Sequence, residues 1–288
     1  MVKDYFKLVT FSHTIFALPF AFLGYFLAVS QAEIPFQWQT LVLVLLCMVF
    51  ARNAAMAFNR YLDRDIDGKN PRTAVREIPA GKISENSALA FVLFNCIAFV
   101  LSTFFINKLC FYLSPIALLI ILGYSATKRF TFLCHFVLGL GLSLAPLGAY
   151  LAAGGGFDTV PILYSLAVLL WVSGFDIIYA LQDESFDKSL NLNSVPVKLG
   201  SKKSLTLSSI LHVICAVVIL IASYLLGEIY PEFGWMRWLA AVFFIGMLIY
   251  QHTLVSPSDL TKVDRAFFTT NGVASVVFGA LMIVDLYL

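Results

Sequence analysis

Long apolar segments alternate with short polar ones along the whole chain. Nine windows of about 17 to 23 mostly apolar residues are each long enough to cross roughly 30 Å of hydrocarbon as a helix. They lie near 10–30, 39–61, 87–107, 110–127, 132–153, 160–182, 204–227, 236–254 and 267–287. The pattern predicts an all-α, polytopic membrane protein with nine transmembrane helices in a single domain that spans residues 1–288.

The amino-acid composition agrees with this fold class. Of the 288 residues, 60% are hydrophobic and only 12% are charged, and the mean hydropathy is +0.88. Such values lie far outside the range of soluble globular proteins, so we expect the lipid bilayer as a partner and no nucleic acid. Five cysteines are scattered through apolar segments without a CxxC pair, which predicts neither a disulfide framework nor a thiolate metal site.

The lysines and arginines gather on one side of the membrane. The connections on the opposite side contain only Lys108 and Arg237, and Arg52 lies inside a span, which leaves 16 of the 19 cations for the first side. By the positive-inside rule the cation-rich side is cytoplasmic. It includes two long connections, 62–86 and 183–203, which we expect to cap an active site that opens to the cytoplasm. The expected location is therefore the inner, cytoplasmic membrane, with many passes.

Two acidic motifs with the same four-residue spacing end two of the apolar segments. They read Asn59-xxx-Asp63-xxx-Asp67 and Tyr179-xxx-Asp183-xxx-Asp187. Side chains at this spacing share one face of a helix, so we expect Arg52 and the first motif to face one cavity from a single helix. Two acidic faces brought together form an oxygen-lined cup for a hard divalent cation. The repeated spacing also hints at an internal duplication of helix-loop-helix units.

The chemistry of these side chains favours magnesium. Four carboxylates that converge without cations repel one another, which implies a bound metal. The ligands are all oxygen, with no histidine or cysteine nearby, and this set suits Mg²⁺, which commonly bridges to substrate phosphates. The predicted metal ligands are Asn59, Asp63, Asp67, Asp183 and Asp187. The substrate is therefore expected to carry phosphates.

Two charged residues lie within the apolar segments themselves. Arg52 and Asp176 are costly inside a membrane unless they line a polar site, so both are functional candidates, and Asp176 is expected to contact substrate. An arginine that simply pairs with a neighbouring helix is the plain alternative for Arg52. Among the loop cations, Arg72 and Lys128 are the preferred ligands for a departing diphosphate, whereas others serve topology alone. Asp65 lies at odd phase to its neighbours and is given no role.

Together these segments resemble the UbiA superfamily of intramembrane aromatic prenyltransferases. The resemblance is carried by Arg52-xxxxxx-Asn59-xxx-Asp63-xxx-Asp67, Asn70-Pro71-Arg72-Thr73, Tyr124-xx-Thr127-Lys128-Arg129-Phe130-Thr131 and Asp176-xx-Tyr179-Ala180-xx-Asp183-xxx-Asp187. It implies nine transmembrane helices around a central cavity with a lateral opening to lipid. It also implies a Mg²⁺-bound polyprenyl diphosphate as donor and a hydroxy-aromatic carboxylate as acceptor.

The resemblance assigns a role to each matched residue. The metal and the diphosphate would be held by Asn59, Asp63, Asp67, Asp183 and Asp187. Lys128 and Arg72 would contact phosphate oxygens, and Arg52 would meet the carboxylate of the acceptor. Loss of diphosphate would leave an allylic carbocation, which Tyr124 and Tyr179 would shield by cation–π contact. The expected enzyme is a polyprenyltransferase.

Three further stretches look more like the prenyltransferases of the futalosine route to menaquinone. They are 11–20, 70–83 and 133–135. The acceptor is therefore expected to be a dihydroxynaphthoate for menaquinone or 4-hydroxybenzoate for ubiquinone, since both present a carboxylate and an activated phenol. His13 and His135 are candidates for a general base, but a lone histidine near a helix end is more often structural, so the base is left open.

An ion-coupled membrane transporter is the alternative from another functional class. Intramembrane acids and an intramembrane arginine also occur in proton relays. Transporters, however, place their coupling acids near the bilayer midplane. Here all the motif acids except Asp176 lie at one interface with a repeated DxxxD spacing, which favours phosphate chemistry.

Overall fold

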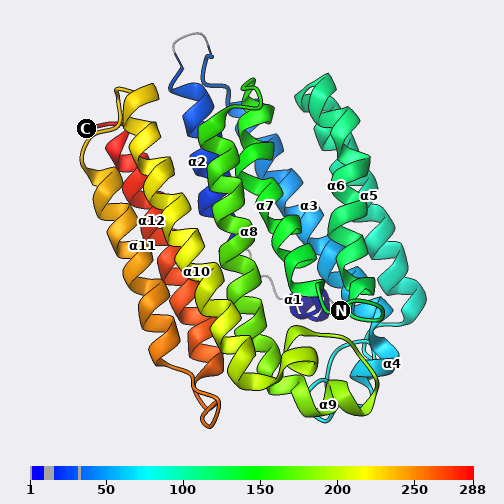
Figure 1. Ribbon diagram of the computed structural model, residues 1–288. Helices are drawn as coiled ribbons and strands as arrows, with labels where there is room; N and C mark the ends of the chain where they lie inside the picture. Colours follow the sequence, from blue (N-terminus) through cyan, green and yellow to red (C-terminus); the bar gives the residue numbers. More distant parts are fainter. Residues whose placement is uncertain (1, 10–15, 32–33) are drawn as a thin grey trace.

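The structure is a computed structural model that describes residues 2–9, 16–31 and 34–288, and its long helices form one bundle (Figure 1). No β-strand occurs in the described part of the chain. The long helices are α2 (Leu18–Val29), α3 (Trp38–Leu62), α5 (Glu85–Ile106), α6 (Lys108–Thr127), α7 (Cys134–Ala153), α8 (Thr159–Ala180), α10 (Val195–Ile229), α11 (Met236–Thr253) and α12 (Asn271–Asp285). The short ones are α1 (Val2–Leu8), α4 (Arg64–Asp67), η2 (Leu181–Asp183), α9 (Glu184–Ser189) and η3 (Arg265–Thr270).

The all-helical membrane fold that the apolar windows predict is confirmed. Seven helices are long and apolar enough to cross a membrane, namely Trp38–Leu62, Glu85–Ile106, Lys108–Thr127, Cys134–Ala153, Thr159–Ser189, Val195–Ile229 and Arg265–Asp285. α2 is apolar but shorter, and α11 is not among the seven. A helix occupies each predicted window, although residues 10–15 of the first window lie outside the described part. A count of nine crossings stays a prediction.

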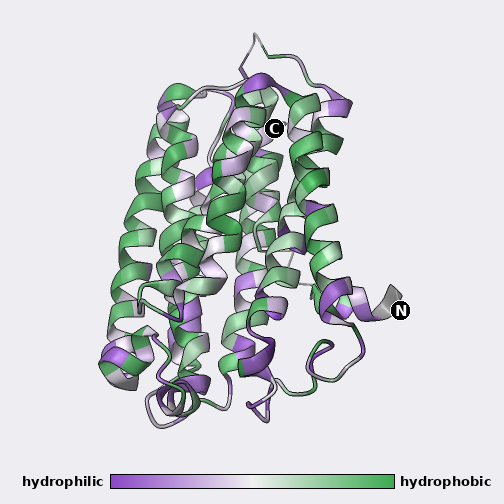
Figure 2. Ribbon diagram, turned by 90° about the vertical axis from the view of Figure 1, so that its right-hand side faces the viewer, coloured by the Kyte–Doolittle hydropathy of each residue, from purple (hydrophilic) through white to green (hydrophobic). Residues whose placement is uncertain are grey.

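Hydrophobic residues cover the length of the long helices, and hydrophilic ones concentrate at the end that carries the long loops (Figure 2). Large apolar side chains on the outer faces are strongly exposed, including Phe105, Tyr112 and Leu119. In a membrane these faces meet lipid, which is as apolar as the side chains themselves. The exposed apolar faces are therefore those expected of a membrane-embedded bundle.

α8 lies at the centre of the bundle. It packs against both α7 and α10, while α3 packs against α5 and α2 packs between α7 and α12. Close approach depends on small residues: a methyl group on Gly139 of α7 would overlap Ser173 and lie 2.6 Å from the carbonyl oxygen of Leu169 on α8. Trp171 of α8 is fully buried, and its Nε1–H donates to Oδ1 of Asn271 at 2.9 Å, which ties α8 to α12.

Local sequence signals set the start of three helices. Side-chain oxygens of Ser84, Asn107 and Ser194 accept hydrogen bonds from backbone N–H groups in the first turns of α5, α6 and α10. α10 is interrupted at Gly200, whose φ of 75° an L residue rarely adopts. Its first turn lies at the start of α7, where the backbone N–H of Val195 donates to Nε2 of His135 at 3.3 Å.

Candidate active site

The eleven residues that the sequence singled out all line one cavity of about 310 Å³. They are Arg52, Asn59, Asp63, Asp67, Arg72, Tyr124, Lys128, Asp176, Tyr179, Asp183 and Asp187. They come from α3 and the residue that follows it, α4, the loop after α4, α6 and the residue that follows it, α8, η2 and α9. α4 and α9 lie at the same end of the bundle (Figure 1), so segments more than 100 residues apart in sequence meet there.

The first acidic motif does not lie on one continuous helix, and our assumption that it does is wrong. α3 ends at Leu62, and Asp63 has φ −93° and ψ 10°, outside regular helix geometry, before α4 begins at Arg64. Asn59 still donates from Nδ2 to Oδ2 of Asp63 at 3.1 Å. Asp67, at the end of α4, is only 5% exposed. The break turns the last acid back toward the cavity.

The second motif is divided in a similar way. Asp176 and Tyr179 lie on α8, Asp183 ends the 3₁₀ turn η2, and Asp187 lies on α9. Asp187 is 1% exposed. Both motifs therefore have the same plan of a long helix, a local break and a short helix that carries the last aspartate. This shared plan is what brings the two sets of carboxylates around one cavity.

Each motif aspartate has a cationic partner. Arg72 forms a two-pronged contact with Asp183, from Nη2 to Oδ2 at 2.5 Å and from Nε to Oδ1 at 3.2 Å. The other pairs join Arg76 Nη1 to Asp67 Oδ1 at 2.6 Å, Lys128 Nζ to Asp187 Oδ1 at 2.8 Å and Arg129 Nη2 to Asp63 Oδ1 at 3.1 Å. The pairs balance the negative charge of the two motifs, and all except Arg76–Asp67 connect segments that are far apart in sequence.

Sequence reasoning missed several of these cations. Arg76 and Arg129 were left without a role, and Arg60 was not considered, yet Arg60 and Arg76 line the cavity. The guanidinium of Arg60 makes no hydrogen bond or ion pair within the described ranges, and its Nε is buried. The signal available was helical phase, because Arg60 follows Arg52 by eight residues, close to two turns of α3.

The acids of the cavity fit a cation. Both carboxylate oxygens of Asp187, and Oδ2 of Asp67, are buried without a hydrogen-bond partner among the described residues, since Lys128 lies close to Asp187 without hydrogen-bond alignment. Burial also raises the pKa of the Asp63 carboxyl to about 6, helped by the nearby Asp67. Uncompensated buried oxygens are costly. As placed, no three acidic, histidine or cysteine side chains of the described part form a ready metal cluster.

The other end of the cavity is apolar. Its wall includes Leu138, Leu142, Val172, Phe175 and Phe267. The rings of Tyr179 and Phe267 lie 4.2 Å apart between centroids. The cavity therefore joins a charged end, able to hold phosphates, to an aromatic and aliphatic end.

Asp176 has a different kind of partner from the other acids. Its Oδ2 lies 2.6 Å from Nδ1 of His135, a residue of α7 that is only 3% exposed. His135 also lines the cavity. The sequence makes His135 a candidate general base without deciding its role, and the structure places it next to Asp176. His13, the other histidine considered, falls outside the described residues.

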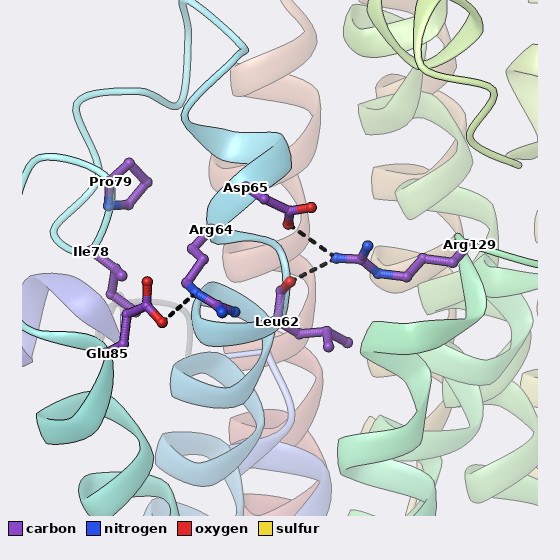
Figure 3. Close-up of a pocket in the computed structure, with 7 residues that line it drawn as sticks. All are labelled: Leu62, Arg64, Asp65, Ile78, Pro79, Glu85 and Arg129. Carbon is purple, nitrogen blue, oxygen red and sulfur yellow. Dashed lines mark hydrogen bonds and ion pairs between the residues drawn. The ribbon is translucent and has the colours of Figure 1, made fainter.

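A second hollow lies beside the loop that follows α3 and is lined by Leu62, Arg64, Asp65, Ile78, Pro79, Glu85 and Arg129 (Figure 3). Arg129 points to Asp65 and to the Leu62 carbonyl, and Arg64 points to Glu85 at 2.9 Å. The charges of this hollow are thus already paired. None of the eleven singled-out residues lines it, so the reacting groups belong to the first cavity.

The fold and the cavity define a membrane-embedded protein with a charged pocket joined to an apolar one, and the comparisons with known proteins agree. The UbiA prenyltransferase family model matches residues 17–273. The 4-hydroxybenzoate octaprenyltransferase of Aliivibrio fischeri (strain MJ11) is 31% identical over 251 residues, covering 87% of this chain and 85% of that protein. The chain therefore belongs to the UbiA prenyltransferase family and is a membrane polyprenyltransferase.

Solved structures share the fold. The apo structure of a UbiA homolog from Aeropyrum pernix K1 matches with a TM-score of 0.83 at 33% identity, covering 95% of this chain and 98% of that one. A UbiA homolog from Archaeoglobus fulgidus, bound to GPP and Mg²⁺, matches with a TM-score of 0.75 at 21% identity, covering 99% and 100%. The resemblance found in the motifs is thus confirmed at the level of family and fold.

Proposed function

We propose that this protein transfers a polyprenyl group from a polyprenyl diphosphate to a hydroxy-aromatic carboxylate, in a Mg²⁺-dependent step of quinone biosynthesis. The observation that carries the proposal is the convergence of both acidic motifs, with their cations, at one end of a cavity whose other end is apolar. The name of the Aliivibrio fischeri relative supports 4-hydroxybenzoate as acceptor. The motif stretches around 70–83 and 133–135 favour a dihydroxynaphthoate.

The metal would be held by Asn59, Asp63, Asp67, Asp183 and Asp187. This set offers only oxygen ligands, and three of its carboxylate oxygens are buried without a hydrogen-bond partner in the described chain, as Mg²⁺ coordination would require. When bound, Mg²⁺ supplies positive charge that stabilises the departing diphosphate. The Archaeoglobus fulgidus homolog was solved bound to GPP and Mg²⁺, which supports a site for a prenyl diphosphate and Mg²⁺ in this fold.

The cations of the site would change partners when the donor binds. Arg72 and Lys128 now contact Asp183 and Asp187, and both line the cavity. With the donor bound, Arg72 and Lys128 would donate to phosphate oxygens, Asp183 and Asp187 would be available as metal ligands, and Arg60 would add a further positive charge. Charge-assisted hydrogen bonds of this kind are about twice as strong as neutral ones.

The apolar end would hold the reacting carbons. The allylic C–O bond breaks, and its electron pair leaves with the diphosphate. Tyr124 and Tyr179 face the carbocation with their rings, while Arg52 holds the carboxylate of the acceptor and so places the carbon ortho to the hydroxyl for attack. The loops 62–86 and 183–203 cap this chamber on the cytoplasmic side of the inner membrane.

A purified-enzyme assay tests the proposal. The protein in detergent is given Mg²⁺ and one long polyprenyl diphosphate, with either 4-hydroxybenzoate or 1,4-dihydroxy-6-naphthoate, and prenylated rings are detected by mass spectrometry. We expect one ring to be alkylated, and EDTA to abolish the product. Asp67→Ala and Asp183→Ala should each reduce turnover by about 10²-fold or more, as expected when groups that stabilise transition-state charge are removed.

The matched control lies on the same short helix as Asp67. The side chain of Asp65 is 62% exposed and lies outside the cavity, so Asp65→Ala should retain nearly full turnover. Alkylation of neither ring, together with no Mg²⁺-dependent binding of the prenyl diphosphate, would contradict the proposal. Proton-coupled uptake by reconstituted vesicles would then favour the transporter alternative.

A further inference from the structure

The proposed transfer produces a proton that some group must accept. When the ring carbon ortho to the hydroxyl forms its new C–C bond, the ring becomes cationic until it loses the hydrogen from that carbon. The four motif aspartates are committed to cations or metal. A proton acceptor close to the attacked ring carbon would therefore be a different side chain, at the apolar end of the cavity.

Asp176 lies at the required depth. It lies on α8, seven residues before Asp183 of the following 3₁₀ turn η2, which places it about 10 Å deeper at roughly 1.5 Å per residue. Arg52 lies on α3, eleven residues before Asp63, the residue of the first motif that corresponds to Asp183. Arg52 and Asp176 therefore both lie below the acidic end, and both line the cavity. The side chain of Asp176 is 21% exposed, and the residue lines the cavity together with Val172 and Phe175.

Hydrogen bonds fix the state of the His135 ring. The backbone N–H of Val195, in the first turn of α10, donates to Nε2 of His135 at 3.3 Å. A nitrogen that accepts a hydrogen bond carries no proton, so the proton of the neutral ring is on Nδ1. There it points at Oδ2 of Asp176, 2.6 Å away.

The dyad can take up a proton only on the carboxylate. A proton added to Nε2 of His135 would point at the backbone N–H of Val195. Two N–H donors would then face each other without an acceptor. Nδ1 is already occupied. Oδ1 of Asp176 makes no hydrogen bond or ion pair within the described ranges, whereas Oδ2 is held by the histidine. The free oxygen is therefore the acceptor.

We propose that Asp176 is the general base of the transfer, and that His135, fixed by the Val195 N–H, is the positioning residue that orients it. This assignment rests on the proposed function. The C–H bond at the alkylated carbon breaks, its electrons restore the aromatic ring, and the proton moves to Oδ1 of Asp176. Release of the product exposes the carboxyl to water, to which the proton is lost.

The decisive variant is Asp176→Asn, which keeps the shape and still accepts from His135 but has no basic oxygen. At saturating acceptor we expect ring alkylation to fall by about 10²-fold or more, the usual contribution of a general base. Diphosphate release should fall much less, because the carbocation then reacts with water to give prenyl alcohol. Mg²⁺-dependent binding of the prenyl diphosphate should stay at the wild-type level.

An isotope measurement separates this role from mere binding of the acceptor. With deuterium on the attacked ring carbon, the wild type should alkylate at an unchanged rate, because loss of the hydrogen is fast. The Asp176→Asn variant should show a primary isotope effect, because that step has become slow. If Asp176 only binds the acceptor, a higher acceptor concentration restores alkylation and no isotope effect appears, which overturns the assignment.

The histidine is tested with a matched pair of substitutions. His135→Phe fills the same space without a donor, and His135→Gln keeps an N–H that can reach the carboxylate. We expect His135→Phe to reduce alkylation by about 10- to 100-fold, as loss of a supporting hydrogen bond does at other sites, and His135→Gln to recover part of it. Equal activity of both variants would overturn the positioning role. A wild type that alkylates no ring would instead overturn the proposed function itself.

Discussion

Asp63 lies where α3 ends and the charged part of the cavity begins. Its carboxyl accepts from Asn59 and from Arg129, but burial is the larger influence and raises its pKa to about 6. The charged form is therefore held at a cost in the metal-free protein at neutral pH. Such a cost is expected where an oxygen is kept ready for a cation.

Substitution of Asp63 should reveal this cost. A rise from 3.8 to about 6 corresponds to about 3 kcal/mol. Because the folded state holds the proton more tightly, the stabilisation from protonation is complete below about pH 4 and is lost as the pH rises through about 6. Without metal, Asp63→Asn should therefore be more stable than the wild type at pH 7, and by a smaller margin at pH 5.

Thermal unfolding in detergent with EDTA measures both proteins at both pH values. The difference in stability between the variant and the wild type is compared at the two pH values. Other titrating groups are the same in both proteins, so their contributions cancel. A margin that stays constant or grows toward pH 5 would contradict the prediction. Added Mg²⁺ should reverse the order at pH 7, because only the wild type offers a carboxylate there.

At the scale of single residues, the sequence predicts the acids of the cavity but not all of their partners. The acids were predictable because DxxxD spacing and the cost of intramembrane charge each point to a site, and all of them line one cavity. Their partners were not, because Arg76 and Arg129 look like any other cytoplasmic cation under the positive-inside rule. The contact of His135 with Asp176 joins residues 41 apart in sequence, and no local pattern encodes it.

At the scale of elements, α7 and α8 meet through small residues. Gly139 faces Leu169 and Ser173 so closely that any side chain would collide with backbone. Both helices also supply the site, through His135 on α7 and Asp176 on α8. The packing of this pair therefore determines how accurately the dyad is placed.

Gly139→Ala should lower the free energy of unfolding by about 1–3 kcal/mol, the usual cost of overpacking, and reduce prenyl transfer. Gly148→Ala is the matched control on the same helix, since nothing lies within 4 Å of the added methyl group. That control should be neutral or stabilise by up to about 1 kcal/mol. Thermal unfolding of the two variants checks the prediction, which equal melting temperatures would refute.

The sequence pattern did not predict that α3 and α8 would end within the acidic motifs. Helical phase placed the first motif on a single face, whereas Asp63 leaves the helical region and α4 starts anew. Apolar periodicity reports on whole turns and is insensitive to a change at one residue. The expected convergence is nevertheless found, because the same kind of break occurs at both motifs.

At the scale of the whole molecule, orientation in the membrane is open to test. Lys69 lies in the loop after α4, and Gly156 lies between α7 and α8 at the other end of the bundle. In a background without the native cysteines, a membrane-impermeant thiol reagent should label Gly156→Cys in intact cells. Lys69→Cys should be labelled only after the membrane is opened. The reverse pattern would contradict a cytoplasmic active site.

The overall architecture was the most predictable level. A helix needs about 20 apolar residues to cross the bilayer, so the windows correspond closely to helices such as α5 and α6. The number of crossings is less certain from length alone, because Leu18–Val29 is shorter than a span. The ion pairs between loops lie beyond prediction, since Arg72 and Asp183 are 111 residues apart.

Those ion pairs have a consequence for kinetics. Arg72 joins the loop of the first motif to Asp183 of the second, and the adjacent Lys128 and Arg129 contact Asp187 and Asp63, one aspartate of each motif. A ligand that enters must compete for both partners of each pair, which a metal diphosphate can do and a singly charged ring cannot. The enzyme should therefore follow a compulsory order, donor before acceptor, and acceptor analogues should inhibit uncompetitively with respect to the donor.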